Sequence, residues 1–208
     1  MDYSLYLVTD AGLARGRTHH EIVQAAIRGG VTVVQYREKS ASTRRMIEEA
    51  RELHDLCRAR GIPFIVNDRV DVALAADADG VHVGQDDMPA SLARKLIGRD
   101  KILGVSAENV AQARAAVTDG ADYIGASPIF ATPTKPDAPP PMGVQGLQEL
   151  TRACTIPIVA IGGLNATNAA SMIRAGAAGV AVISAIVNAE DVERAARELK
   201  QVVESSRK

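Results

Sequence analysis

Short runs of apolar and β-branched residues alternate along the chain with longer segments of helical periodicity. Each apolar run is too short for a helix and is bounded by Gly, Pro, Asp or Asn, which is typical of a buried strand. In the longer segments, apolar residues recur on one helical face, as they do in 46–57 and 192–203. The predicted strands cover residues 5–8, 31–35, 63–66, 80–83, 102–105, 123–126, 158–161 and 180–183.

A short sequence motif recurs where helical segments are followed by strands. The sequences at 77–81, 120–124 and 176–180 each indicate a helix end, a tight turn and a strand start. Eight strand–helix units in this length leave about 26 residues for each, which predicts one α/β domain over 1–208, folded as a (β/α)8 TIM barrel. A doubly wound open sheet shows the same alternation, but no Gly-x-Gly-x-x-Gly follows the first strand, so the barrel is favoured.

Composition and charge narrow the classes of partner. The chain has 24 Lys and Arg against 25 Asp and Glu, so a long-range attraction to nucleic acid or to an anionic membrane is not expected. Aromatic residues make up 3%, which disfavours a surface that stacks bases. The chain has two cysteines, Cys57 and Cys154, which is too few for a disulfide framework and fits a reducing compartment. We interpret both as small apolar residues rather than nucleophiles. We expect a cytoplasmic protein.

Polar and charged residues alternate at the end of the second predicted strand. In an extended chain, Gln35, Arg37 and Lys39 point to one side, whereas Tyr36 and Glu38 point to the other. Two cations and an amide on one face need an anion or the solvent-filled mouth of a barrel. A strand that ends in a solvated loop is the alternative interpretation.

Acidic residues follow the next two predicted strands. Asp68 comes after the third strand, and Asp86 and Asp87 come after the fourth, so two carboxylates are expected to meet at neighbouring strand ends. Paired carboxylates without Cys or His suit Mg²⁺, which keeps several waters and also binds substrate phosphate. Helix capping is the better interpretation of any isolated Asp. Two of them beside a cationic strand end favour the metal site.

Other polar groups are predicted at the same end of the barrel. Ser106 ends the fifth strand, Gly163 follows the seventh and Ser184 follows the eighth. Loops after strands seven and eight of barrels often bind phosphate through backbone N–H groups, although paired glycines also form simple turns. His82 lies inside the fourth strand and is expected to be a hydrogen-bonded barrel residue rather than a base.

One long irregular segment is predicted at 127–146. It contains Thr132, Thr134 and Lys135, two hydroxyls and an ammonium group, between several prolines. A loop of this length in a compact domain is usually functional or disordered, and a disordered surface insertion is the alternative. We expect an active-site loop.

Several motifs, in this order and spacing, resemble the thiamine-phosphate synthase family. The resemblance extends from the first strand to 183–186. The motifs are Gln35-Tyr36-Arg37-Glu38-Lys39, Asn67-Asp68-Arg69, the segments 80–87 and 104–106, Thr132-Pro133-Thr134-Lys135-Pro136-Asp137, and 160–163.

The resemblance implies a barrel enzyme that joins two small phosphorylated substrates, a pyrimidine diphosphate and a thiazole phosphate, and releases pyrophosphate. Family positions that bind the pyrimidine diphosphate match Gln35, Arg37, Lys39, Asn67, Ser106 and Lys135. Those that bind Mg²⁺ match Asp68 and Asp87. Those that bind the thiazole phosphate match Thr132, Thr134, Gly163, Ile183 and Ser184. Arg37, Lys39, Ser106 and Lys135 are the catalytic residues that we predict.

Two other functions stay open at this point. A thiazole tautomerase of the same fold would isomerise its substrate without pyrophosphate release, and it would not need the acidic pair and the Gln-x-Arg-x-Lys face. A binder of thiamine precursors would have no turnover. The sequence decides neither whether the protein forms a homo-oligomer nor whether the thiazole substrate is carboxylated.

Overall fold

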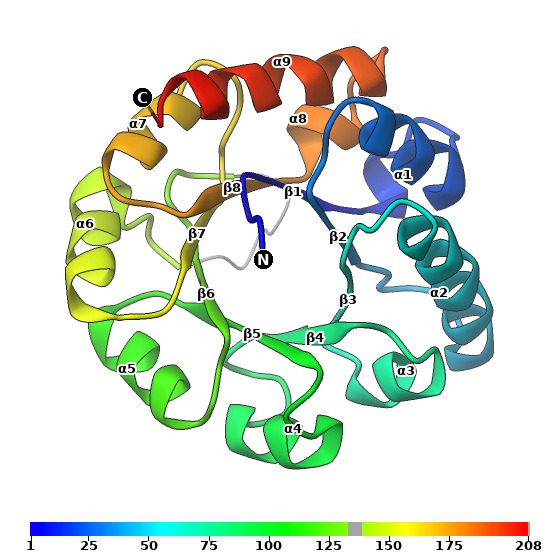
Figure 1. The fold of residues 1–208 in the computed structure, drawn as a ribbon, viewed down its shortest axis with the longest axis horizontal. Coiled ribbons are helices and arrows are strands. Elements are labelled where there is room, and N and C mark those ends of the chain that lie inside the picture. Colours follow the sequence, from blue (N-terminus) through cyan, green and yellow to red (C-terminus); the bar gives the residue numbers. More distant parts are fainter. Residues whose placement is uncertain (133–138, 208) are drawn as a thin grey trace.

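Eight parallel strands close into a barrel with helices around it (Figure 1). The structure is a computed structural model that describes residues 1–132 and 139–207. Each strand pairs with its neighbours in sequence, and β1 pairs with β8 in the register Tyr6 with Ala181. The predicted (β/α)8 barrel is therefore confirmed.

The strands lie where the apolar runs predict them, with small shifts. The predictions for β1, β4, β6 and β7 match to the residue. β5 continues to Ala107, so Ser106 lies inside this strand and does not end it. The strands are β1 (Leu5–Val8), β2 (Val33–Tyr36), β3 (Phe64–Asn67), β4 (Gly80–Val83), β5 (Ile102–Ala107), β6 (Tyr123–Ala126), β7 (Ile158–Ile161) and β8 (Gly179–Val182).

Helices connect successive strands. They are η1 (Ala11–Leu13), α1 (His19–Arg28), α2 (Thr43–Arg58), α3 (Val70–Ala75), α4 (Ala90–Ile97), α5 (Val110–Thr118), α6 (Gly143–Ala153), α7 (Ala169–Arg174), α8 (Ser184–Val187) and α9 (Val192–Ser205). The irregular segment predicted at 127–146 is too long, because α6 begins at Gly143 and buries Leu147 and Leu150. Within 1–132 and 139–207, none of the helices combines the length and the hydrophobicity that a membrane crossing needs.

The recurring helix-to-strand motif has the same backbone geometry at each of its three occurrences. Asp77, Gly120 and Gly176 each adopt a left-handed conformation directly after a helix. The next residue donates its N–H back into the last turn, as Ala78 does to Ala73 O at 2.9 Å and Ala121 to Ala116 O at 2.9 Å. This closing hydrogen bond is the Schellman pattern, which ends the helix and turns the chain into the following strand.

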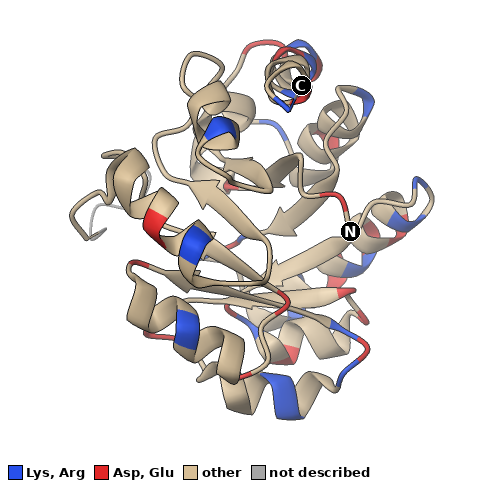
Figure 2. Ribbon diagram, turned by 60° about the vertical axis from the view of Figure 1, so that its left-hand side comes forward, with Lys and Arg blue, Asp and Glu red and all other residues tan. Residues whose placement is uncertain are grey.

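The core has two layers, one inside the barrel and one between the strands and the helices. In β1, Tyr6 and Val8 contribute to the inner layer and Leu5 and Leu7 to the outer one. None of the eight strands contains Lys, Arg, Asp or Glu, as parallel strands that are buried on both faces require. Figure 2 shows the charged residues on the helices and connecting segments instead. Charged groups of a site must therefore come from segments that follow the strands.

Candidate active site

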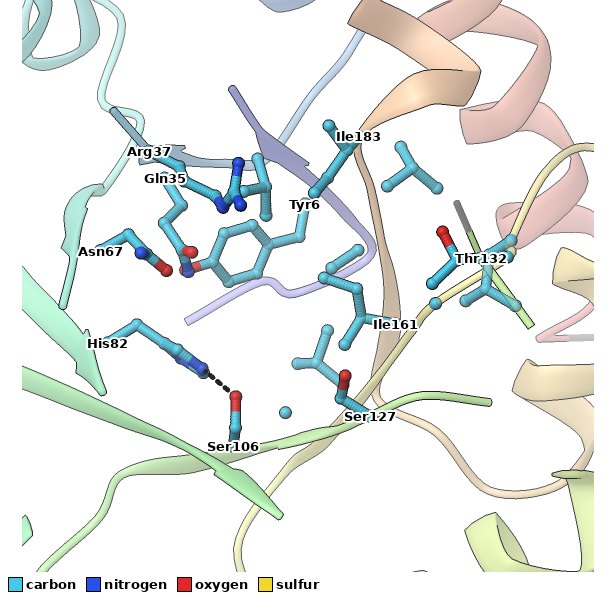
Figure 3. A pocket seen from close by; sticks show the side chains of 18 of the residues that line it. Tyr6, Gln35, Arg37, Asn67, His82, Ser106, Ser127, Thr132, Ile161 and Ile183 are labelled. Atoms are coloured by element: carbon cyan, nitrogen blue, oxygen red, sulfur yellow. Dashed lines mark hydrogen bonds between the residues drawn. The ribbon is translucent and has the colours of Figure 1, made fainter. Parts of the chain in front are cut away.

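A pocket opens at the carboxyl ends of the strands, and most of the predicted site residues line it (Figure 3). It extends from β2 and β3 across the barrel mouth to the segments after β7 and β8. The predicted residues in its wall are Gln35, Arg37, Asn67, Ser106, Thr132, Gly163, Ile183 and Ser184. Residues of both predicted anion-binding regions thus line one pocket.

The remaining predicted residues fall into two groups. Lys39, Asp68 and Asp87 form a charged cluster beside Asn67, in which Lys39 Nζ lies 2.5 Å from Asp68 Oδ2. The predicted residues Thr134 and Lys135 lie outside the described residues.

Neither Asp68 nor Asp87 caps a helix. The residue that precedes α3 is Arg69, and the one that precedes α4 is Pro89. Asp68 adopts a left-handed conformation with φ of 60°, and its backbone N–H donates to His82 O at 2.7 Å. A non-glycine residue in this conformation is uncommon and is concentrated at functional sites. The capping interpretation is therefore wrong for both residues.

The two carboxylates of this cluster influence each other. Burial raises the pKa of Asp87, and the nearby carboxyl group of Asp68 raises it further, although a hydrogen bond from Gly84 N at 2.8 Å and the charge of Lys39 oppose the shift. Two like charges held together in this way are stabilised by a cation.

The acidic pair fits Mg²⁺ better than a metal that needs many protein ligands. Among the described residues, no three side chains of His, Cys, Asp or Glu are grouped so that they could hold an ion. A cation here would take Asp68 and Asp87 and complete its coordination with water and substrate oxygens. Mg²⁺ prefers this arrangement, because it retains waters and binds through one or two carboxylates plus phosphate.

Residues just after β1 hold Arg37 at the end of β2. The Arg37 guanidinium forms an ion pair with the carboxylate of Asp10, and both side chains are less than one-fifth exposed. The backbone N–H of Arg37 donates to Thr9 Oγ1 at 3.0 Å. The sequence analysis did not identify Asp10, although this acidic residue follows the first strand with only Thr9 between them. Asp10 fixes Arg37 at the pocket wall.

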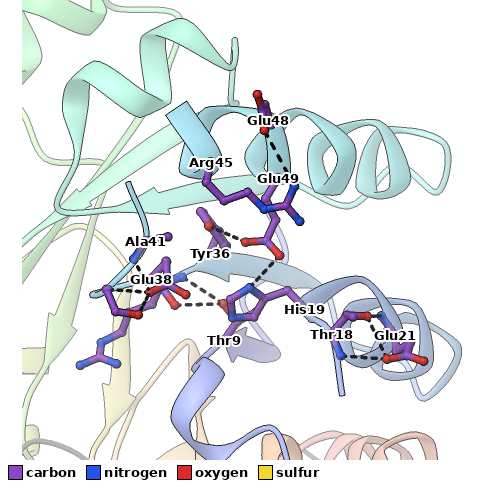
Figure 4. Close-up of polar contacts among 12 residues, drawn as sticks. Thr9, Thr18, His19, Glu21, Tyr36, Glu38, Ala41, Arg45, Glu48 and Glu49 are labelled. Atoms are coloured by element: carbon purple, nitrogen blue, oxygen red, sulfur yellow. Dashed lines mark hydrogen bonds and ion pairs between the residues drawn. The ribbon is translucent and has the colours of Figure 1, made fainter. Parts of the chain in front are cut away.

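The opposite face of β2 packs against α1 and α2 (Figure 4). The Tyr36 hydroxyl donates to Glu49 Oε2 at 2.7 Å, and Glu49 Oε1 lies 3.2 Å from His19 Nδ1. The Glu38 carboxylate accepts from Ser40 N at 2.6 Å. The predicted alternation is therefore confirmed for Gln35 and Arg37, which line the pocket, and for Tyr36, which faces the helices.

A continuous run of hydrogen bonds crosses the barrel interior. Gln35 Nε2 donates to the Tyr6 hydroxyl at 2.9 Å, which lies 2.7 Å from the Tyr123 hydroxyl. His82 Nδ1 lies 2.9 Å from the Tyr123 hydroxyl, and His82 Nε2 lies 2.9 Å from Ser106 Oγ. We call these five residues the interior chain.

His82 is the predicted hydrogen-bonded barrel residue. Burial lowers the pKa of its imidazole to about 4, which leaves the ring neutral at neutral pH. Tyr6 and Tyr123 were missed in the sequence analysis. A tyrosine among the small and aliphatic residues of a barrel strand is the signal that could have found them, since a buried hydroxyl needs a partner.

The segment after β6 is held against the end of β7. Ile129 N donates to Ile161 O at 2.9 Å, and Phe130 N donates to Gly162 O at 3.1 Å. A side chain at Gly163 would place its Cβ only 2.8 Å from Ala131 O, so the close approach requires glycine. This contact brings Thr132 to the pocket.

Both cysteines are free and lie outside the pocket wall. Cys57 is buried, and this burial raises the pKa of its thiol to about 12. Burial also raises the pKa of Cys154. Neither thiol has the lowered pKa of a nucleophile.

Comparisons with known proteins identify the family of this chain. The sequence profile of a family described as thiamine monophosphate synthase matches residues 5–186. The thiamine-phosphate synthase of Chloroflexus aurantiacus is 65% identical over 203 residues, 98% of this chain and 94% of that protein. That of Moorella thermoacetica is 51% identical over 205 residues, 99% of this chain and 98% of that protein.

Solved structures give the same result. Thiamine phosphate pyrophosphorylase from Pyrococcus furiosus superimposes with a TM-score of 0.92 at 42% identity, covering 99% of this chain and 97% of that one. A 3-hexulose-6-phosphate synthase, with a TM-score of 0.70 at 18% identity, shares the fold alone. The matched profile and the near full-length relatives show that this chain belongs to the thiamine-phosphate synthase family.

Proposed function

We propose that the protein condenses 4-amino-2-methyl-5-hydroxymethylpyrimidine diphosphate with 4-methyl-5-(2-hydroxyethyl)thiazole phosphate, or with its carboxylated form, in thiamine biosynthesis. The products are thiamine phosphate and pyrophosphate, with CO2 as a third product when the thiazole is carboxylated. The observation that carries the proposal is the single pocket that extends from Arg37 and Asn67, at the ends of β2 and β3, to the segments after β7 and β8. Two phosphorylated substrates can meet in such a pocket with their reacting atoms between two anion sites.

The diphosphate is assigned to the charged side of the pocket. Arg37 and Lys39 would bind its oxygens, while Gln35, Asn67 and Ser106 would bind the pyrimidine. Mg²⁺ held by Asp68 and Asp87 would neutralise charge on the diphosphate as it leaves. Lys135 is predicted to add a further positive charge to this group.

The thiazole phosphate is assigned to the opposite side. Thr132, Gly163, Ile183 and Ser184 line the wall there, and Thr134 is predicted to join them. Loops after strands seven and eight are the common phosphate site of barrels. Ile161, Val182 and Ile183 offer apolar contacts for a thiazole ring.

The reaction requires no protein base. The bond between the methylene carbon and the bridging oxygen breaks, and its electron pair leaves with pyrophosphate. The lone pair of the thiazole nitrogen then forms the new C–N bond to the same carbon, so no proton is transferred when the thiazole is not carboxylated. The electron-rich aminopyrimidine stabilises a cationic methylene, which favours a dissociative path. Positive groups at the diphosphate accelerate it, because negative charge grows on the leaving oxygen.

A coupled assay for pyrophosphate release tests the proposal. We expect release only with both substrates and Mg²⁺ present, and a large loss of activity in Asp68→Ala. Thiazole turnover without pyrophosphate would instead support the tautomerase, and binding without turnover would support the non-catalytic binder. Full activity of Asp68→Ala would remove the metal role given to this residue.

A further inference from the structure

The interior chain crosses the middle of the barrel, and all five of its residues line the pocket. Gln35 on β2 and Ser106 on β5 are its ends, and three side chains from β1, β6 and β4 connect them. Tyr6 and Tyr123 are each 1% exposed, and His82 is 9% exposed. These polar side chains therefore exchange hydrogen bonds with one another rather than with bulk water.

Two glycines leave space in the barrel interior for the side chains of the interior chain. A Cβ at Gly104 would lie 2.2 Å from Tyr123 Cζ and 2.4 Å from His82 Nδ1, and one at Gly125 would lie 3.0 Å from His82 Cε1. Any larger residue at Gly104 would displace both rings. The two glycines on β5 and β6 leave the room that the tyrosine and the histidine need.

The number of available protons fixes which group donates at each hydrogen bond of the interior chain. The Gln35 amide nitrogen can only donate, so the Tyr6 oxygen accepts from it. The Tyr6 proton then has the Tyr123 oxygen as its acceptor among the described residues, and the Tyr123 proton must go to His82 Nδ1. The reverse direction would leave the buried Tyr6 proton without a partner, which is costly.

The direction determines what Ser106 can do. Since His82 Nδ1 accepts, the imidazole proton lies on Nε2 and is donated to Ser106 Oγ. Ser106 keeps its own hydroxyl proton for a ligand in the pocket, and the Gln35 amide keeps its oxygen as an acceptor. A 4-aminopyrimidine carries the complementary pair, a ring nitrogen that accepts beside an amino group that donates.

We propose that the interior chain holds His82 in its Nε2–H tautomer and thereby makes Ser106 a hydrogen-bond donor to the aminopyrimidine. Tyr6, Tyr123 and His82 are positioning residues for recognition of this substrate. The ligand assignment rests on the proposed function, whereas the tautomer follows from the hydrogen bonds alone.

Histidine-selective ¹⁵N NMR of the wild-type protein tests the tautomer. The His82 signals are assigned by their loss in His82→Gln. We expect a protonated Nε2 and an unprotonated Nδ1 at pH 7.5. A proton on Nδ1 would overturn the proposal. This spectrum does not depend on turnover, so an enzyme without pyrophosphate release would count against the proposed function and not against the tautomer.

Steady-state kinetics test the consequence for recognition. Tyr123→Phe removes the donor to Nδ1 and keeps the ring, so KM for the pyrimidine diphosphate should rise about ten-fold while KM for the thiazole phosphate stays within about two-fold. Tyr3→Phe is the matched control, because the Tyr3 ring packs 5.0 Å from that of Tyr123 outside the interior chain. Equal rises in both KM values, or the same effect in Tyr3→Phe, would refute the positioning role.

Discussion

Replacing Asp87 by Asn separates the structural cost of the acidic pair from its use in metal binding. Asn retains an oxygen that can accept the hydrogen bond from Gly84 N, which is 2.8 Å long in the wild-type protein. The substitution removes one of the two negative charges that raise each other's energy. We therefore expect Asp87→Asn to stabilise the metal-free protein and to weaken Mg²⁺ binding.

The size of the stabilisation follows from Coulomb's law. Two unit charges 4 Å apart repel by about 1 kcal/mol in water and by about 4 kcal/mol at an effective dielectric constant of 20. The Asp68 side chain is 20% exposed, and Lys39 Nζ lies 2.5 Å from it, so both solvent and a cation screen the pair. We take about 1 kcal/mol, which corresponds to a rise in Tm of about 2–4 °C for a chain of this size.

The stabilisation should depend on pH. Burial and then the Asp68 carboxyl raise the pKa of Asp87 above the ordinary value of 3.8. The wild-type protein therefore loses stability as pH rises through the folded-state pKa, because Asp87 becomes charged there. The advantage of Asp87→Asn should be complete at neutral pH and disappear well below pH 3.8.

Thermal unfolding in EDTA and a Mg²⁺ titration of pyrophosphate release measure the two effects. The Mg²⁺ concentration for half-maximal rate should rise about ten-fold or more in Asp87→Asn. Asp86→Asn is the control, since Asp86 is the exposed neighbour and should change neither quantity. An unchanged Mg²⁺ requirement together with an unchanged or lower Tm in Asp87→Asn would refute the shared cation site.

Three further predictions concern the barrel interior and the thiols. Since burial lowers the pKa of His82 to about 4, the unfolded state binds its proton first as pH falls below about 6.5. Urea unfolding should show a loss of about 2 kcal/mol between pH 7.5 and 5 in the wild-type protein that His82→Gln lacks. Gly104→Ala should lower the free energy of unfolding by about 1–3 kcal/mol or more, because its Cβ would overlap Tyr123, and an unchanged urea midpoint would contradict this packing. Iodoacetamide should modify the partly exposed Cys154 in the folded protein, whereas Cys57, with the pKa of its thiol raised to about 12 by burial, should react only after unfolding, as mass spectrometry of the peptides can show.

The strands were predictable because their signals are local. An apolar run between turn-forming residues predicts β1, β4, β6 and β7 to the residue, and the alternation of side chains at the end of β2 correctly separates Gln35 from Tyr36. The predicted end of the long irregular segment, at residue 146, was wrong, because α6 begins at Gly143. Several prolines precede α6 and indicate an irregular segment, so the helical spacing of Leu147 and Leu150 was not recognised in the sequence.

The partners of the site residues were not predictable, because they depend on the register of a closed barrel. The Tyr6 and Tyr123 hydroxyls lie together although they are 117 residues apart in sequence, and Arg37 pairs with Asp10 from the segment after the neighbouring strand. Whether Asp68 capped a helix or faced a second carboxylate was equally open. Arg69, not Asp68, precedes α3, and Asp68 has a left-handed backbone, a conformation that no local pattern of side chains specifies.

The condensation of two substrates in one pocket is the central claim, and ³¹P NMR of a single reaction mixture tests it most directly. With enzyme, Mg²⁺, the pyrimidine diphosphate and the thiazole phosphate, the account predicts that pyrophosphate and thiamine phosphate appear together in a 1:1 ratio. Neither product should form when one substrate is left out. Pyrophosphate that appears without thiamine phosphate, or a thiazole phosphate that changes while the diphosphate stays intact, would contradict the account.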